Sequence, residues 1–272
     1  MAITNEDGIV AGMKPAASFV KNAFTGEAAG QWHNLGVVAG NPGVWTLGAP
    51  GMAGAAVVAN ALGGALPFDN PSTGFAYLAK LAASVGANIR ALMLYDLLWY
   101  QSGIAETTTT AQTVNSVALP ARDKAGSVNG DGVEAWLHTT TVTGNAGAIS
   151  NTTLGYTNQA GTAGRSAGLA YNFPITAVAG TMVPFGLQGS DRGVRSIQSV
   201  TLGTSYVSGQ IELLMLRRLA MLPFEGAQVG KLLDWAGLGL PRLFNDSAIY
   251  LAALLSGTAA DVVNGEANFA HG

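Results

Sequence analysis

The sequence predicts a mainly β fold: a β-sandwich, built as one body or as two related lobes, with a short N-terminal helix and a C-terminal helix. Short apolar segments alternate with Gly, Pro, Asn and Thr about every ten residues from Trp32 onward, as in β-sandwiches and barrels. Residues 133–143 are rich in β-branched and aromatic side chains, which favour strands. Helix signals are confined to the two ends of the chain.

The N-terminal segment carries the clearest helix signal. Thr4 or Asn5 can serve as the N-cap, acidic residues follow in the first turn, and apolar residues then recur at helical spacing before Pro15. We therefore expect a helical arm over residues 1–22 and a β-rich body over residues 23–272. If the body has two lobes, their boundary lies near residues 125–165.

Two apolar segments of the body resemble each other. Residues 89–99 and 211–221 align at an offset of 122 residues with five identities. One interpretation is an internal duplication, and the other is convergence of two buried strands on Leu and Met. We expect strands, although periodicity alone cannot distinguish a buried strand from a buried helix in a continuous apolar run.

The other elements are expected from local patterns. Residues 133–143 alternate between two faces and follow a hairpin turn at Asp131-Gly132. Helical spacing of Val229, Leu232 and Leu233 predicts a helix over residues 225–238. Residues 247–256 form a strand or a short helix, and the last nine residues form a polar tail outside the body.

The composition predicts association. Charged residues make up 11% of the 272 residues, against about 25% in an ordinary soluble domain, while the chain has 37 glycines and 45 alanines. A solvent-exposed monomer normally carries a denser mixture of charges. Residues 28–68 and 135–164 contain no Asp, Glu, Lys or Arg, and we expect subunits to meet there.

Several partners and locations are excluded by charge and pattern. Thirteen Lys and Arg against sixteen Asp and Glu leave no basic stripe for direct nucleic-acid binding. The chain has no cysteine, hence no disulfide or thiolate chemistry. We see no signal peptide at the start of the chain and no uninterrupted apolar run long enough for a transmembrane helix, so no membrane is expected.

No pattern of catalytic or metal-binding residues stands out. The three histidines are far apart in sequence, without the spacing of a zinc site, and a GxSxG nucleophile motif is absent. Residues 129–134 superficially resemble a calcium loop but are better explained as a turn. A catalytic pair of carboxylates, as in glycoside hydrolases, remains an open alternative, because its members can be far apart in sequence and meet only in the fold. We expect no enzyme, cofactor or metal.

Charged residues in a charge-poor chain mark candidate contacts between subunits, because Arg presents a planar fork that suits a carboxylate across an interface. The alternative is a solvated turn. Arg217-Arg218 lies inside an apolar run, so one of the two side chains needs a partner, for which Asp96 or a neighbouring subunit is available. The candidate interface residues are Arg122, Asp123, Arg165, Asp191, Arg192, Arg195, Arg217, Arg218, Trp32 and Trp45.

Six segments spread over most of the chain stand out: MAITNEDGIVAGM, YDLLWYQSGI, AQTVNSVALPARD, LGYTNQAGTAGR, DRGVRSIQSV and ANFAHG. They resemble segments of virion structural proteins of tailed bacteriophages. The resemblance implies an all-β subunit of a virus particle, made in the host cytoplasm, whose partners are copies of itself and other virion proteins. The resemblance does not give the position in the particle. The β-rich pattern and the low charge favour a capsid decoration, cement or minor capsid protein over a tail-tube, collar or baseplate component.

A different class stays open beside this resemblance. Five tryptophans, at positions 32, 45, 99, 136 and 235, are compatible with a carbohydrate-binding or hydrolytic β-sandwich. Tryptophans also anchor protein cores and interfaces, which is the interpretation we favour.

Overall fold

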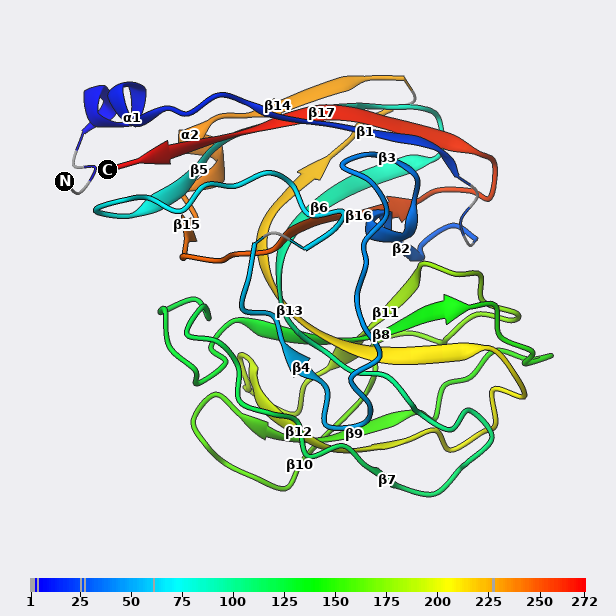
Figure 1. The fold of residues 1–272 in the computed structure, drawn as a ribbon. Coiled ribbons are helices and arrows are strands. Elements are labelled where there is room, and N and C mark those ends of the chain that lie inside the picture. Colours follow the sequence, from blue (N-terminus) through cyan, green and yellow to red (C-terminus); the bar gives the residue numbers. More distant parts are fainter. Residues whose placement is uncertain (1–2, 4, 25, 27, 61, 227) are drawn as a thin grey trace.

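Two β-sheets form the fold, and every strand pairing within them is antiparallel (Figure 1). The structure is a computed structural model that describes residues 3, 5–24, 26, 28–60, 62–226 and 228–272. The mainly β prediction is confirmed.

The first sheet contains both ends of the chain, and we call it the terminal sheet. Its strand order is β14, β5, β17, β1 and β3, with β15 also paired to β5. The bounds are β1 (Ala17–Phe24), β3 (Gly40–Asn41), β5 (Ala76–Val85), β14 (Gly230–Leu233), β15 (Arg242–Leu243) and β17 (Asp261–His271).

Six strands of the second sheet close into a ring, the central barrel. They pair in the order β2, β16, β6, β13, β8 and β11, and β11 pairs again with β2. Their bounds are β2 (Trp32–Asn34), β6 (Ile89–Tyr100), β8 (Val133–Thr141), β11 (Thr181–Gly186), β13 (Gln210–Pro223) and β16 (Ile249–Leu255).

The remaining strands extend the barrel wall into a third layer. From β11 the sheet continues through β10, β9, β12 and β7, while β4 pairs with the end of β6. We call β7, β9, β10 and β12 the outer strands. The bounds are β4 (Ala55–Ala56), β7 (Gln112–Thr113), β9 (Thr153–Asn158), β10 (Arg165–Leu169) and β12 (Val194–Thr201).

Helices are few and short. The N-terminal helix α1 spans Glu6–Gly12, and the Asn5 side chain caps it by accepting a hydrogen bond from the Gly8 N–H, as expected. A single 3₁₀ turn spans Leu35–Val37, and α2 spans Trp235–Leu238. Among the residues that the structure describes, no helix has the length and apolarity needed to cross a bilayer.

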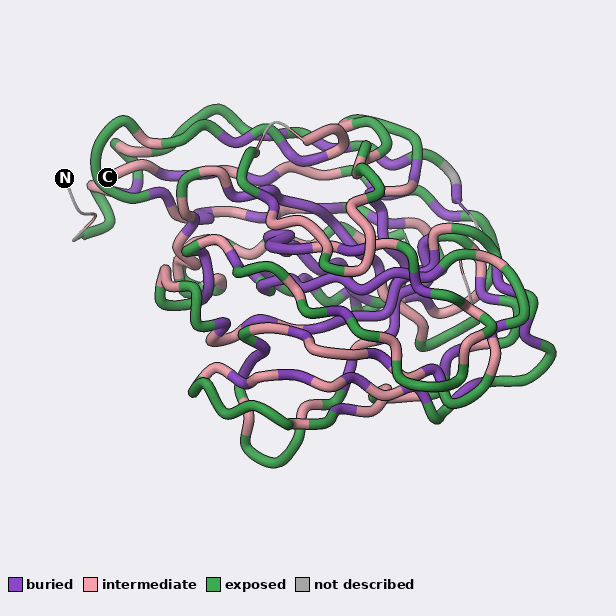
Figure 2. Tube along the Cα trace, turned by 60° about the horizontal axis from the view of Figure 1, so that its bottom comes forward, coloured by how far each residue is buried: buried purple, intermediate pink, exposed green. Residues whose placement is uncertain are grey.

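The core has three main parts, and the long strands β6 and β13 contribute side chains to all of them. Met93 and Tyr95 of β6 point into the barrel, whereas Leu92 and Leu94 pack toward the terminal sheet. Leu98, farther along β6, packs toward the outer strands. Figure 2 shows the buried residues concentrated between the layers, with exposed residues on the surrounding loops.

The two similar apolar segments are indeed strands, but they are neighbours. Residues 89–99 lie in β6 and residues 211–221 in β13, and the two strands pair antiparallel, with Arg217 opposite Asp96. Both strands contribute side chains to the core on each side of the barrel. The two strands therefore do not each belong to a separate part of the fold. The division into two lobes near residues 125–165 stays a prediction.

The expected helix over residues 225–238 is wrong. Residues 230–233 form β14 at the edge of the terminal sheet, and only the single turn α2 follows. Val229 and Leu233 both pack on the core, while Leu232 is 52% exposed. Residues four apart lie on one face of a strand as well as of a helix, so the spacing was ambiguous.

The expected polar tail is also wrong. Residues 261–271 form β17, which lies between β5 and β1 inside the terminal sheet. Val263, Ala267 and Phe269 face the core, and the intervening polar residues face outward. In a strand with one face buried, every second residue faces solvent and is commonly polar. The polar residues of β17 therefore resemble those of an exposed tail in sequence.

The structure also differs from the expectations for the N-terminal arm and for the turn before β8. The predicted arm, residues 1–22, includes α1 and most of β1, which pairs with β17.

Asp131-Gly132 is a turn, but the segment before it supplies no partner strand for β8, which pairs with β13 and β11 instead. The hairpin interpretation is therefore wrong, because the turn links a long loop to β8.

Gly265 of β17 is expected to tolerate no side chain. A Cβ there would lie 2.3 Å from the Ala82 carbonyl oxygen and 2.4 Å from the Phe19 ring. Gly265→Ala should therefore lower the free energy of unfolding by about 1–3 kcal/mol in urea denaturation. Gly168→Ala is the matched control, since it also lies in a strand but has no atom within 4 Å of its Cβ position. Equal stability of the two variants would contradict this packing.

Candidate functional site

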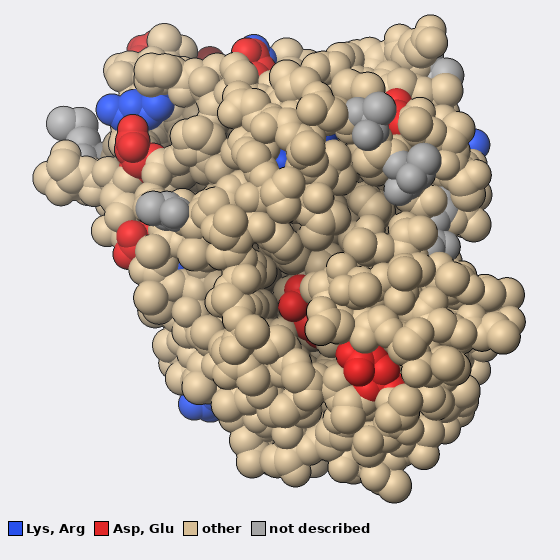
Figure 3. Space-filling model, turned by 45° about the vertical axis from the view of Figure 1, so that its right-hand side comes forward, with Lys and Arg blue, Asp and Glu red and all other residues tan. Residues whose placement is uncertain are grey.

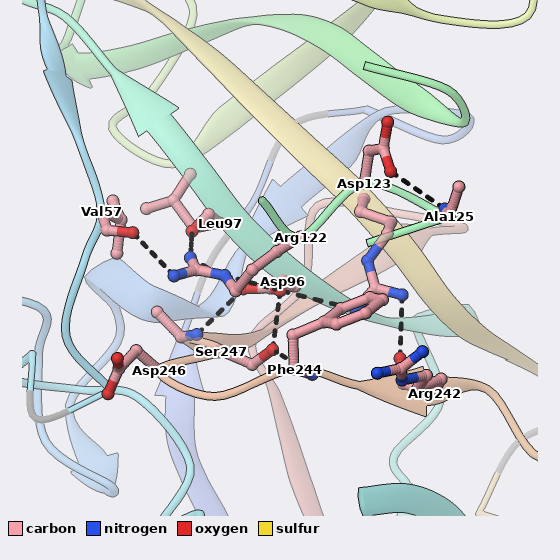
Figure 4. Close-up of polar contacts among 12 residues, drawn as sticks. Val57, Asp96, Leu97, Arg122, Asp123, Ala125, Arg242, Phe244, Asp246 and Ser247 are labelled. Carbon is pink, nitrogen blue, oxygen red and sulfur yellow. Dashed lines mark hydrogen bonds and ion pairs between the residues drawn. The ribbon is translucent and has the colours of Figure 1, made fainter. Parts of the chain in front are cut away.

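Asp96 is the centre of a buried ionic cluster on the outer side of the barrel (Figure 4). Its side chain is fully buried and contacts two arginines: Arg122 Nε lies 3.2 Å and Arg217 Nη2 3.5 Å from Asp96 Oδ2. The Ser247 hydroxyl and the Ala248 N–H also donate to the carboxylate, at 2.8 and 2.9 Å. All these partners belong to the same chain.

The alternation of β13 explains the Arg217-Arg218 pair. Arg217 lies opposite Asp96 in the β6–β13 register, so its side chain shares the face of Asp96, as the sequence suggested. Arg218 points to the other face and donates to Glu134 Oε1 at 2.6 Å. Burial lowers the pKa of Arg217, while the charge of Asp96 opposes this shift.

A groove of about 450 Å³ lies beside the cluster, and we call it the Arg242 groove. The Arg242 guanidinium is stacked on two rings, 3.7 Å from the centre of Phe75 and 4.6 Å from that of Phe244. No described residue accepts a hydrogen bond from the Arg242 side chain, whose Nε is buried without a partner. The sequence did not single out Arg242, since it lies alone between apolar residues. The lining of the Arg242 groove includes Val58, Phe75, Arg122, Arg242, Phe244 and Asp246.

A second groove, of about 370 Å³, brings together four of the ten predicted interface residues. We call it the Trp32 groove. Trp32 packs edge-on against Trp136 at 6.1 Å, and the Trp136 indole donates to Glu134, the partner of Arg218. Aromatic rings beside Arg and carboxylate groups are typical of contact hot spots. The four predicted residues in its lining are Trp32, Asp191, Arg192 and Arg218.

The other predicted interface residues divide by burial. Arg122, Asp123 and Arg217 are buried and have partners in the same chain, and their assignment to a subunit interface stays a prediction. Arg165 pairs with Asp191 at 2.8 Å, at the surface of the outer strands. Trp45 packs over His138 and Tyr250 and covers the barrel interior. Arg192 and Arg195 are exposed.

Asp123 is a structural residue. Its carboxylate accepts hydrogen bonds from the N–H groups of Ala125, Ser127 and Asp131 and from the Ser127 hydroxyl. Burial opposes ionisation, but these hydrogen bonds outweigh it and hold the pKa below its usual value. The donors occupy the oxygens that calcium would need, which agrees with the turn interpretation of residues 129–134.

Asp191 is expected to titrate well below an ordinary aspartate. Hydrogen bonds from Arg165, Tyr156 and Asn158 lower its pKa to about 2 from 3.8. Because the folded pKa is lower, the ionised group stabilises the fold above about pH 4, and this contribution is lost as the pH falls toward 2. An NMR titration of the carboxyl carbon should give a midpoint near 2, and Arg165→Gln should raise it. A wild-type midpoint at or above 3.8 would contradict this geometry.

The barrel interior holds a chain of polar groups that the sequence did not reveal. Asn34 Oδ1 accepts from the Tyr95 hydroxyl and the Gly36 N–H, so its amide NH₂ donates to His138 Nε2 at 3.2 Å. His138 therefore carries its proton on Nδ1 and donates to Glu212 Oε1 at 2.7 Å. Glu212 lines a hollow at one end of the barrel. Both ring nitrogens of His138 therefore have hydrogen-bond partners.

His33 lies beside this chain without joining it. It stacks on Phe24 with ring centres 5.0 Å apart, and burial lowers its pKa to about 4. Nowhere in the described ranges do three or more His, Asp or Glu side chains form a group suited to a metal ion. The two grooves combine arginine side chains with aromatic rings and are therefore suited to binding.

Searches against protein-family models and curated proteins gave no match. Among solved structures, the subviral particle of infectious bursal disease virus VP2 aligns at 9% identity over 100% of this chain and 83% of that chain, with a TM-score of 0.20. The Gx strain of the same virus aligns at 12% identity over 94% and 81%, with a TM-score of 0.21. Scores of this size do not show a common fold, so the resemblance to tailed-phage virion proteins stays a prediction.

Proposed function

We propose that the chain is a structural subunit of a virus particle that acts by binding copies of itself and neighbouring particle proteins. The observation that carries the proposal is a charge-poor surface with large apolar side chains exposed on it. Figure 3 shows one face, where charged atoms form only a few separated clusters. A surface with few charges and a low net charge favours association between folded chains. The most exposed apolar side chains are Val10, Val58, Val207, Ile175 and Leu232, between 73% and 52% accessible.

The particle assignment rests on the sequence resemblance to tailed-phage virion proteins. Within such a particle, we propose a capsid decoration or minor capsid position, because a layered β subunit with little charge suits binding to an existing lattice. A tail-tube, collar or baseplate position is the alternative. None of these roles requires catalysis.

Electron microscopy of the purified chain tests the proposal. We expect regular oligomers, rings or sheets whose abundance rises with protein concentration. Uniform single particles of 27.6 kDa at every concentration would contradict it. Amorphous aggregates without a repeating contact would contradict it as well, because subunit association requires defined geometry.

Carbohydrate binding is a second candidate, favoured by the Trp32 groove alone. The groove combines Trp32 with the carboxylates of Glu134 and Asp191, a combination suited to stacking on a sugar and accepting its hydroxyl hydrogen bonds. A glycan array tests it: binding that is lost in Trp32→Ala and kept in Trp235→Ala would support it, and no binding to any glycan would exclude it for the glycans tested.

A further inference from the structure

We propose that two copies pair about a two-fold axis, with α1 of each copy lying in the Arg242 groove of the other. The proposal rests on the proposed self-association and specifies one of its surfaces. The contact would join the acidic first turn of α1 to the Arg242 guanidinium. Unpaired charges, exposed apolar side chains and the position of both elements at one end of the fold support this contact.

The groove presents a cation that is held in place but not neutralised. Stacking on Phe75 and Phe244 fixes the plane of the Arg242 guanidinium, and no described residue accepts from it. Asp246 also lines the groove and carries a negative charge, but among the described residues it forms no ion pair with Arg242; its Oδ1 accepts from the Asn70 amide at 2.9 Å. A preorganised arginine fork binds a carboxylate with two parallel hydrogen bonds. The groove therefore suits an acidic side chain.

Helix α1 presents carboxylates without partners. Glu6 and Asp7 are exposed in its first turn, and within the described part of the chain neither forms a hydrogen bond or an ion pair. Ile9 is 3% exposed and packs on Ala79 and Ala270, which holds the helix against the terminal sheet. The acidic turn is thus displayed outward from a fixed position.

Apolar side chains accompany the charges on both surfaces. Val10, one turn after Glu6, is 73% exposed, although it lies on a helix that is otherwise anchored to the body. Across the groove, Val58 is 68% and Phe75 37% exposed. An acidic turn followed by an apolar side chain is therefore complementary to an arginine flanked by apolar side chains.

Both surfaces lie at the same end of the molecule, as a two-fold contact requires. Figure 1 shows α1 and β15, which carries Arg242, on one side of the fold. Leu240, two residues before Arg242, packs in the same small cluster as Ile9 of α1. In a two-fold interface each copy supplies both halves, so one patch that contains helix and groove is self-complementary.

Charge reversal tests the pairing by sedimentation velocity. Glu6→Lys/Asp7→Lys and Arg242→Glu should each raise the dimer Kd by about tenfold or more, because each places like charges in both contacts of the homodimer. An equimolar mixture of the two variants should restore the dimer, since one contact then joins Lys to Glu and the other keeps the wild-type pair.

The controls separate folding and self-association from this contact. Glu225→Lys/Glu266→Lys changes net charge equally outside both surfaces and should leave the dimer unchanged. Arg242→Gln is the second groove variant if Arg242→Glu unfolds. A wild-type dimer that both reversals leave intact, or a mixture that fails to restore pairing, overturns this inference and leaves the proposed function standing. A wild-type monomer throughout overturns the proposed function itself.

Discussion

Replacing Asp96 by asparagine is expected to lower the free energy of unfolding by about 3–5 kcal/mol, although the two side chains have nearly the same size. The substitution removes the one carboxylate that Arg122 and Arg217 contact, while both guanidinium groups stay buried. An uncompensated buried charge costs far more than a lost surface pair. The cluster also fixes the β6–β13 register and the loop that carries Ser247.

Urea denaturation measures this effect. Glu266→Gln is the matched control, since it removes the partner of Lys80 in an ion pair that is about one third exposed, and it should cost less than about 1 kcal/mol. Adding Arg122→Met and Arg217→Met to Asp96→Asn should recover much of the loss, because no buried charge then lacks a partner. A loss below about 1 kcal/mol for Asp96→Asn alone would show that the cluster is not desolvated.

Trp136→Ala is expected to cost about 3–5 kcal/mol. Trp136 is 2% exposed and packs in the barrel interior with Leu214, Leu216 and Met182. The strands of the closed barrel cannot move inward one by one to fill the cavity left by the indole, because each strand is paired on both sides. The substitution also leaves Glu134 without its indole donor.

Trp136→Phe serves as the graded control, since it keeps most of the ring volume and removes only the indole N–H. We expect it to lose less than half as much stability as Trp136→Ala in the same denaturation experiment. If the two variants lose equal stability, the Glu134 hydrogen bond rather than packing dominates. If both resemble the wild type, Trp136 does not fill the barrel.

Sequence patterns predicted the strands better than their partners. The apolar segments at 89–99 and 211–221 and the alternating segment from Val133 are strands as expected, because their patterns reflect burial of one or both faces. Their antiparallel pairing and the closure of the barrel through β2 join residues far apart in sequence. Local patterns carry no signal for such pairings.

The ends of the chain were predicted less well than its middle. Asn5 was identifiable as an N-cap because capping depends on neighbours in sequence. By contrast, β14 and β17 are strands only because β5 offers them an edge. Asn264 and Glu266 read as tail residues, although they are the outward half of a buried strand.

The site residues were found where charge stood out against apolar surroundings. Arg217 needed a partner, and the suggested Asp96 contacts it. Arg242 gave no such signal, because its stacking on Phe75 and Phe244 depends on loops brought together by the fold. Part of the charge-free sequence lies inside the fold, because residues 135–141 belong to β8 in the barrel wall.

Sedimentation velocity of the wild-type chain over about three decades of concentration tests self-association most directly. We expect the mean mass to rise from that of a 27.6 kDa monomer to a defined multiple as the protein concentration increases. A single species at the monomer mass across the whole range, up to millimolar protein, would contradict it.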